Sequence, residues 1–172
     1  MIGSLQRILR GEFSSETRLL LDAHIRAPDG SERSATALND IVVQRCEGGR
    51  MLYFETLIAG KPLNAHAGDG LIVATPTGST AYALSCGGPI IEPNLNAIVI
   101  VPVCPHTLSD RPIVISADLR VEVILHAHGN SKAEIAVDGI SLGQLGPEDR
   151  LVITRSSQQI TLIHPPGYDF YE

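Results

Sequence analysis

The sequence predicts a mainly β fold: a single domain over residues 1–172, built as a two-sheet antiparallel β-sandwich of about nine to eleven strands. Three observations predict it. Polar and apolar residues alternate at period two along most of the chain, as in strands with one buried face. Turn sequences rich in glycine and proline recur at intervals of roughly 8–12 residues. Apolar residues make up 44% of the chain and charged residues 19%, a composition typical of globular domains.

The N-terminal segment is expected to form a short helix followed by a strand. Leu5, Ile8 and Leu9 lie on one helical face, and Gly11 fits a helix stop. Alternation begins afterwards and predicts a strand over residues 19–26.

Two more strands are predicted over residues 34–44 and 51–59. Residues 28–31 read Pro-Asp-Gly-Ser, in which proline fixes φ and glycine supplies a positive φ. Gly48 and Gly49 predict a second tight turn. Because these connections are short, the first three strands are expected to form a meander.

The middle of the chain predicts two strands that are buried on both faces, with one helix between them. Residues 71–74 and 97–103 are continuous apolar runs. Residues 79–86 carry helix-forming side chains and end at a Gly-Gly-Pro sequence, which predicts one short inserted helix.

The C-terminal third predicts a series of short strands. Asp138-Gly139 between two alternating runs is a strong hairpin sequence, and it explains Asp138 without any chemical role. The expected strands cover residues 119–128, 133–137, 140–145, 151–154 and 159–163.

Charge and hydropathy exclude several classes of protein. There are 13 Lys and Arg against 19 Asp and Glu, so the net charge of −6 argues against a nucleic-acid surface. No apolar run approaches the roughly 18 residues of a membrane span, and the N-terminus lacks the apolar core of a signal peptide. The widely spaced Cys46, Cys86 and Cys104 favour reduced thiols and a cytoplasmic protein.

The most informative segment is residues 68–82. Asp69 stands between two glycines, just before a strand that is expected to be buried. A turn rich in hydroxyl groups, including Thr77 and Thr80, then leads into the expected helix. Helix N-termini bind anions and polar ligands, so this turn is a candidate ligand site. An ordinary N-cap explains the same residues, and both interpretations stay open.

Four segments resemble NAD kinases in sequence and in order. They are residues 36–40 (Thr-Ala-Leu-Asn-Asp), 69–85 (from Asp-Gly-Leu-Ile-Val-Ala-Thr-Pro-Thr-Gly-Ser-Thr to Ser), 105–114 and 164–168. The resemblance covers nearly the whole chain and implies the C-terminal, NAD-binding β-sandwich domain of that family. The family phosphorylates the adenosine-ribose 2′-hydroxyl of NAD to give NADP, with ATP as donor and a divalent metal, Mg²⁺, accompanying it.

The resemblance also implies NAD-binding residues. Asn39 and Asp40 would lie near the nicotinamide nucleotide and its ribose, and Tyr82 would pack against a ring. The full set implied is Asn39, Asp40, Arg50, Asp69, Thr77, Thr80, Ala81, Tyr82, Ala83, Leu84 and Ser85. The family also forms dimers and tetramers, so a homo-oligomer is expected.

One family motif is missing from the sequence. The Gly-Gly-Asp-Gly-Thr segment of the family's N-terminal α/β domain, with its presumed catalytic aspartate, is absent. No catalytic residue is therefore expected in this chain, which is predicted to be inactive by itself. Nor is a metal site expected, because His126 and His128 fit a solvated strand face better than a metal site. The alternatives are a non-catalytic dinucleotide-binding module and a related diacylglycerol or sphingosine kinase domain.

Overall fold

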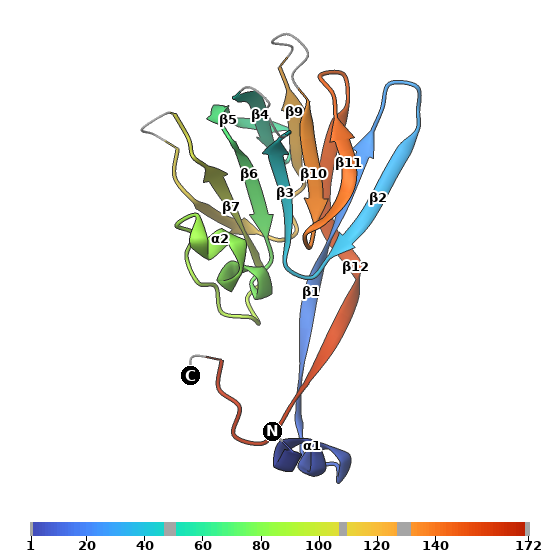
Figure 1. Ribbon diagram of the computed structural model, residues 1–172, viewed down its shortest axis with the longest axis vertical. Coiled ribbons are helices and arrows are strands. Elements are labelled where there is room, and N and C mark those ends of the chain that lie inside the picture. Colours follow the sequence, from blue (N-terminus) through green and yellow to red (C-terminus); the bar gives the residue numbers. More distant parts are fainter. Residues whose placement is uncertain (1, 47–50, 107–109, 127–131, 171–172) are drawn as a thin grey trace.

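The computed structural model describes residues 2–46, 51–106, 110–126 and 132–170, and these form two six-stranded antiparallel sheets (Figure 1). Sheet A has the strand order β2-β1-β12-β9-β4-β5, and sheet B has the order β11-β10-β3-β6-β7-β8. The predicted sandwich is therefore confirmed, with twelve strands in the described part of the chain. The elements are α1 (Ile2–Leu9), β1 (Ser14–Arg26), β2 (Glu32–Ala37), β3 (Asp40–Arg45), β4 (Leu52–Ile58), β5 (Lys61–Gly68), β6 (Gly70–Ala74), the 3₁₀ turn η1 (Thr77–Thr80), α2 (Tyr82–Ser85), β7 (Ala97–Val103), β8 (Ile113–Ser116), β9 (Val121–Leu125), β10 (Ala133–Val137), β11 (Ile140–Leu145) and β12 (Arg150–His164).

The main hydrophobic core lies between the two sheets. Alternate residues of nearly every strand point into it, and Phe54 is the largest of the fully buried side chains. The inner face predicted for β9 is confirmed, because Val121, Val123 and Leu125 are all buried in this core. Glu122, expected on a solvated face, is buried as well and pairs with Arg120. The period-two pattern of the sequence thus becomes the inner face of each sheet.

A second, smaller core covers the outer face of sheet B. The predicted double burial of β6 and β7 is confirmed: Leu71 and Val73 enter the main core, whereas Ile72 and Ala74 enter the second. The other members of the second core are Val42, Ala83, Ile91, Val99, Val101 and Ala136. The segment that contains η1 and α2 packs on this face and brings its polar residues close to β3.

The predicted meander is wrong. The alternating run over residues 34–44 is two strands, β2 and β3, which belong to different sheets. The chain crosses from sheet A to sheet B at Leu38 and Asn39, as strands do at the corners of sandwiches. β4 then pairs with β5 and β9 rather than with β3. The turn predicted at Gly48 and Gly49 lies outside the described residues.

Other elements also differ from expectation. The strands predicted at residues 151–154 and 159–163 are one strand, β12, whose pairing with β1 carries a register shift beside Leu19 and Leu21. β5 and β8 were not predicted; β5 buries His66 and exposes Leu63 and Ala65, the reverse of the usual pattern, and β8 is only four residues long. The helix expected near 79–86 is split into η1 and α2 at Ala81, where φ is −93° and ψ is −129°.

The two longest strands form a ribbon that leaves the sandwich. β1 and β12 continue together beyond the sheets, and α1 lies at the far end of this ribbon (Figure 1). The predicted N-terminal helix is confirmed, but its apolar side chains face solvent: Leu5 is 59% exposed and Leu9 78%. None of the described helices has the length and apolar character that crossing a membrane requires.

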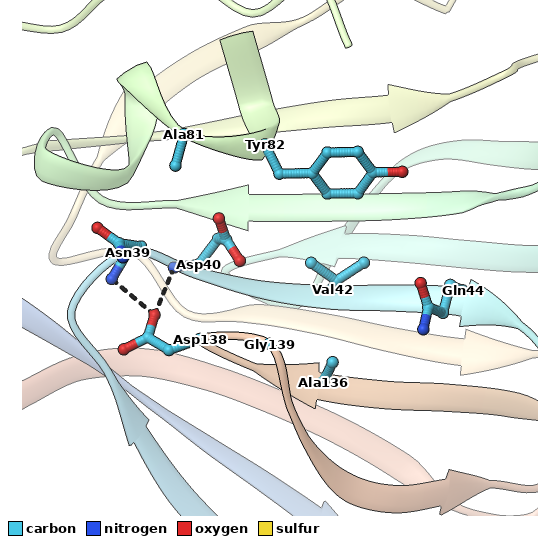
Figure 2. Close-up of a pocket in the computed structure, with 9 residues that line it drawn as sticks. All are labelled: Asn39, Asp40, Val42, Gln44, Ala81, Tyr82, Ala136, Asp138 and Gly139. Carbon is cyan, nitrogen blue, oxygen red and sulfur yellow. Dashed lines mark hydrogen bonds between the residues drawn. The ribbon is translucent and has the colours of Figure 1, made fainter. Parts of the chain in front are cut away.

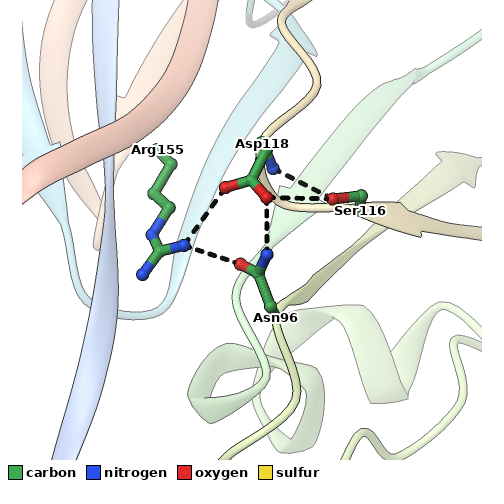
Figure 3. A network of polar contacts seen from close by, with 4 residues as sticks. All are labelled: Asn96, Ser116, Asp118 and Arg155. Atoms are coloured by element: carbon green, nitrogen blue, oxygen red, sulfur yellow. Dashed lines mark hydrogen bonds and ion pairs between the residues drawn. The ribbon is translucent and has the colours of Figure 1, made fainter.

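A polar network joins the two sheets near the base of the ribbon (Figure 3). From β12, Arg155 Nη1 donates to Asn96 Oδ1 at 2.9 Å and contacts Asp118 Oδ1 at 3.1 Å. Asn96 Nδ2 donates to Asp118 Oδ2 at 2.7 Å. Because Asn96 precedes β7 and Asp118 follows β8, the network ties sheet A to an edge of sheet B.

This network predicts a pH dependence of stability. The hydrogen bond from Asn96, and then that from Arg155, lower the pKa of Asp118 below its ordinary value of 3.8. A lowered pKa in the folded state stabilises the fold above pH 3.8, and this contribution is lost as the pH falls through the folded-state pKa. We expect Asp118→Asn to flatten the acid side of the pH profile of urea unfolding. Glu148→Gln is the exposed control, and identical acid limbs for Asp118→Asn and the unchanged chain would contradict the prediction.

Candidate functional site

A cavity of about 350 Å³ runs along β3 on the outer face of sheet B (Figure 2). Asn39 and Asp40 lie at one end and Gln44 at the other, with Val42 between them. Ala81 and Tyr82 form one wall, from the inserted helical segment. The β10–β11 turn forms the opposite wall, so the full lining is Asn39, Asp40, Val42, Gln44, Ala81, Tyr82, Ala136, Asp138 and Gly139.

Asn39 and Asp40 reach the cavity because the chain changes sheets immediately before β3. Asp40 is buried, with 6% of its surface exposed. Burial raises the pKa of its carboxyl above the ordinary 3.8, and the neighbouring charge of Asp138 raises it further. The structure thus brings together two carboxyl groups and an amide at one end of an apolar groove. Binding of NAD by Asn39 and Asp40 stays a prediction.

The helical segment contributes fewer cavity residues than expected. Ala81 and Tyr82 line the cavity, whereas Ala83 is buried in the second core. The other predicted residues of the segment, Thr77, Thr80, Leu84 and Ser85, are not among the lining residues. Burial raises the pKa of the Tyr82 hydroxyl, and the neighbouring Cys86 raises it further.

Of the two interpretations of this turn, the ordinary helix N-cap is not found at the N-cap residues Pro76 and Ala81, although Thr75 Oγ1, one residue before Pro76, accepts the N–H of Gly78. The hydroxyls of this segment bond internally instead: Ser79 Oγ donates to the carbonyl of Pro76 at 2.6 Å and accepts the N–H of Ile91 at 3.0 Å. Thr80 Oγ1 donates to the carbonyl of Thr77 at 3.3 Å. These bonds hold the turn that carries Tyr82.

Asp69 lies at the corner between β5 and β6 and is not one of the residues that line the cavity. Its Oδ1 is 3.2 Å from Arg45 Nε, and its backbone is bonded on both sides, to Val103 and Arg45. The flanking Gly70 packs on the neighbouring strand, because a Cβ there would lie 2.0 Å from the carbonyl oxygen of Val43. Asp69 thus has a defined structural partner, and its ligand role stays a prediction. Arg50, also predicted to bind NAD, lies outside the described residues.

Sequence reasoning missed Asp138, which it explained as turn chemistry alone. The hairpin turn is confirmed by the positive φ of Asp138 (48°) and Gly139 (78°). The carboxylate of Asp138, however, accepts backbone N–H groups from the segment that carries Asn39 and Asp40 (Figure 2). Those partners lie about a hundred residues away in the sequence, so no local pattern could have revealed the contact.

Comparison with known proteins places this geometry in a family. The model of the ATP-NAD kinase C-terminal domain matches residues 38–165. The NAD kinase of Halorhodospira halophila is 41% identical over 172 residues, which cover 99% of this chain and 56% of the relative. The NAD kinase of Nitrosococcus oceani is 44% identical over 167 residues, 97% of this chain and 57% of the relative. The chain thus spans little more than half the length of these relatives.

Solved structures agree in fold. The structure of yeast NADH kinase complexed with NADH superposes with a TM-score of 0.90 at 27% identity, over 99% of this chain and 52% of that one. An NAD kinase from Archaeoglobus fulgidus in complex with ATP gives a TM-score of 0.72 at 25% identity, over 96% of this chain and 60% of the other. By sequence and by fold, the chain belongs to the ATP-NAD kinase C-terminal domain family.

Proposed function

We propose that this domain binds NAD in the cavity along β3 and, within an intact kinase, presents the adenosine-ribose 2′-hydroxyl to ATP. The observation that carries the proposal is the cavity itself, where Asn39, Asp40 and Tyr82 of the family's sequence segments meet. Family membership supports it independently, as does the likeness to a kinase solved with NADH.

The lining suits part of a dinucleotide. Small-molecule sites combine apolar walls with a few polar groups that fix orientation. Val42 and Ala136 supply apolar surface, and the ring of Tyr82 offers a face for a base or a nicotinamide. Carboxylates accept hydrogen bonds from ribose hydroxyls, which is the role we propose for Asp40.

The reaction divides between this domain and groups that the chain does not contain. The 2′-oxygen attacks the γ-phosphorus of ATP; the new O–P bond forms as the bond to the β-phosphate oxygen breaks, and the hydroxyl proton passes to a base. This domain positions the nucleophile. We propose that the divalent cation accompanies ATP, as metal ions do in other phosphoryl transfers. Without the Gly-Gly-Asp-Gly-Thr segment, the chain alone is expected to form no NADP.

A titration with NAD tests the proposal. Backbone amide resonances of the 172-residue chain are followed by NMR as NAD is added to millimolar concentration, which detects weak as well as strong binding. We expect shifts at Asn39, Asp40, Tyr82 and Gly139, with free phosphate as the control ligand. Shifts that cluster elsewhere, or none at all, would reject the proposed site. A diacylglycerol or sphingosine analogue that moved these resonances in place of NAD would favour the lipid-kinase alternative.

We also propose that the protein is a homo-oligomer. Tyr82, Leu84 and Ile90 expose apolar surface close together in sequence, at 44%, 43% and 55% of each residue. Large exposed apolar patches mark protein interfaces, and Leu84 and Ile90 are candidates for such a surface beside the cavity residue Tyr82. Sedimentation that showed only monomer at high micromolar concentration would count against self-association.

Replacing Asp69 by asparagine is expected to weaken NAD binding by roughly ten- to a hundredfold. Besides burial, the charge of Asp69 helps to raise the pKa of the Tyr82 hydroxyl, so a dinucleotide that extends from the cavity past Tyr82 would meet this carboxylate. A charge-assisted hydrogen bond to that part of the ligand would be lost, whereas asparagine keeps the shape of the corner. The melting temperature is expected to change little. Arg45→Gln is the matched variant, because it breaks the ion pair with Asp69 but leaves the carboxylate. Unchanged affinity in Asp69→Asn would mean that this carboxylate serves only Arg45 and the corner.

A further inference from the structure

The segment Leu38–Asp40 is held in an unusual way for a strand connection. This segment crosses from sheet A to sheet B. It therefore has no continuous backbone hydrogen-bond ladder with neighbouring strands on both of its edges. Backbone N–H and C=O groups that lose water on folding need other partners. Here all six of these groups find partners in only two residues, Asp138 and Thr75.

Asp138 satisfies the donors. Its Oδ2 accepts the N–H of Leu38 at 2.7 Å. Its Oδ1 accepts the N–H groups of Asn39 at 2.8 Å and Asp40 at 3.1 Å (Figure 2). Its own backbone N–H donates to the carbonyl of Asp40 at 3.0 Å. Hydrogen bonds to an ionised acceptor are stronger than neutral ones, and this carboxylate accepts three.

Thr75 satisfies the remaining acceptors from the opposite side. Its Oγ1 donates to the carbonyl of Leu38 at 2.6 Å, and its backbone N–H donates to the carbonyl of Asn39 at 2.9 Å. The same Oγ1 accepts the N–H of Gly78 at 3.0 Å, which connects the segment to the turn before Tyr82. The crossover is therefore clamped between the β10–β11 hairpin and the start of the helical segment.

The clamp carries an electrostatic cost. The charge of Asp138 contributes to the raised pKa of the buried Asp40 carboxyl, so the clamp disfavours the ionised form of Asp40. The hairpin turn by itself does not require a carboxylate at position 138, since Asn-Gly forms the same type of turn as Asp-Gly without a charge beside Asp40. The second acceptor oxygen is what asparagine lacks, and Leu38 uses it.

We propose that Asp138 is a positioning residue of the NAD site, which fixes Asn39 and Asp40 through the backbone of the crossover. The proposal rests on the proposed function of the cavity. Binding groups act well only when their supporting contacts hold them in place. Asp138 thus affects NAD through Asn39 and Asp40, with its carboxylate oxygens already engaged by backbone donors.

Asp138→Asn tests the proposal, because asparagine tolerates the left-handed backbone but places an NH₂ group where one acceptor stood. In the 172-residue chain, we expect the Leu38 amide to exchange with solvent deuterium roughly tenfold faster or more, and NAD to bind roughly ten- to a hundredfold more weakly. Asp149→Asn is the control, since Asp149 also accepts a backbone N–H, from Gly146 at 2.8 Å, in a different turn.

A double-mutant cycle separates positioning from a general structural role. If Asp138 acts through Asn39, then Asn39→Ala should weaken NAD binding clearly in the unchanged chain and little further in the Asp138→Asn background. Additive losses, or unchanged affinity in Asp138→Asn, would overturn the proposal.

If the unchanged chain does not bind NAD, the proposed function fails and the positioning role fails with it. The exchange rate of Leu38 still reports on the clamp in that case, so the two failures are distinguishable.

Discussion

Replacing Gly78 by alanine is expected to lower NAD affinity by more than about a hundredfold, and to destabilise the fold by roughly 1–3 kcal/mol. A Cβ at this position would lie 2.1 Å from the carbonyl oxygen of Asn39 and 2.4 Å from its carbonyl carbon. Backbone atoms cannot rotate aside as a flexible side chain can. The Asn39 carbonyl is also bonded to the N–H of Thr75, so relief requires that the crossover move as a unit. That movement displaces Asn39 and Asp40 from the cavity.

Calorimetric titration with NAD and urea unfolding together check this prediction. Gly146→Ala is the control, because a Cβ there meets Asp149 Oδ2 at 3.4 Å, an ordinary contact. If Gly78→Ala bound NAD like the unchanged chain, the crossover would not need its observed position, and the cavity along β3 would not be the site.

The sequence pattern predicted most of the sandwich because burial follows local alternation. The continuous apolar runs of β6 and β7 indicated strands covered on both faces, and Leu71 and Ile72 do enter opposite cores. The Asp138-Gly139 turn was equally local, since the positive φ values it needs depend only on those two residues. Features that depend on residues adjacent in the sequence, such as strand burial and this turn, could therefore be predicted from the sequence alone.

The crossover at Leu38 could not be predicted in this way. Apolar residues keep the same parity on both sides of it although Leu38 and Asn39 interrupt the alternation, and no glycine or proline marks the break between β2 and β3. What stabilises the break is a carboxylate about a hundred residues away, together with Thr75. The meander was therefore a reasonable local inference that a long-range contact overrides.

In the candidate site, too, local sequence features could be predicted and long-range contacts could not. Resemblance to a family indicated the segments around Asn39 and Tyr82, and the fold brings both to one cavity. The resemblance gave no information on which neighbours of Tyr82 reach that cavity; because the helical segment is broken at Ala81, Ala83 enters the second core instead. Asp138 was assigned to the turn because its function as a hydrogen-bond acceptor exists only in the folded chain.

The largest loss of stability is expected for Phe54→Ala, at roughly 3–5 kcal/mol in the free energy of unfolding. Phe54 is fully buried in the main core on β4, and its ring stacks on that of His66 at a centroid distance of 5.1 Å and an interplanar angle of 27°. Truncation removes the ring's burial and leaves a cavity between strands that the sheet ladders hold in place. His66 also loses the ring that covers it on β5.

Urea unfolding of the chain measures this loss, read as a fall in the midpoint at unchanged slope. Phe54→Leu is the matched variant; it keeps an apolar side chain, and we expect it to lose roughly half as much stability or less. His66 is buried and bonded to Asp110, with 3.1 Å between Nδ1 and Oδ2, so Phe54→Ala should also raise the solvent exposure of a polar pair that Phe54→Leu keeps covered. A loss below about 1 kcal/mol in the free energy of unfolding of Phe54→Ala would contradict this prediction. It would show that the two sheets move together to fill the space of the missing ring, and that the edge formed by β4 and β5 deforms far more easily than a packed core.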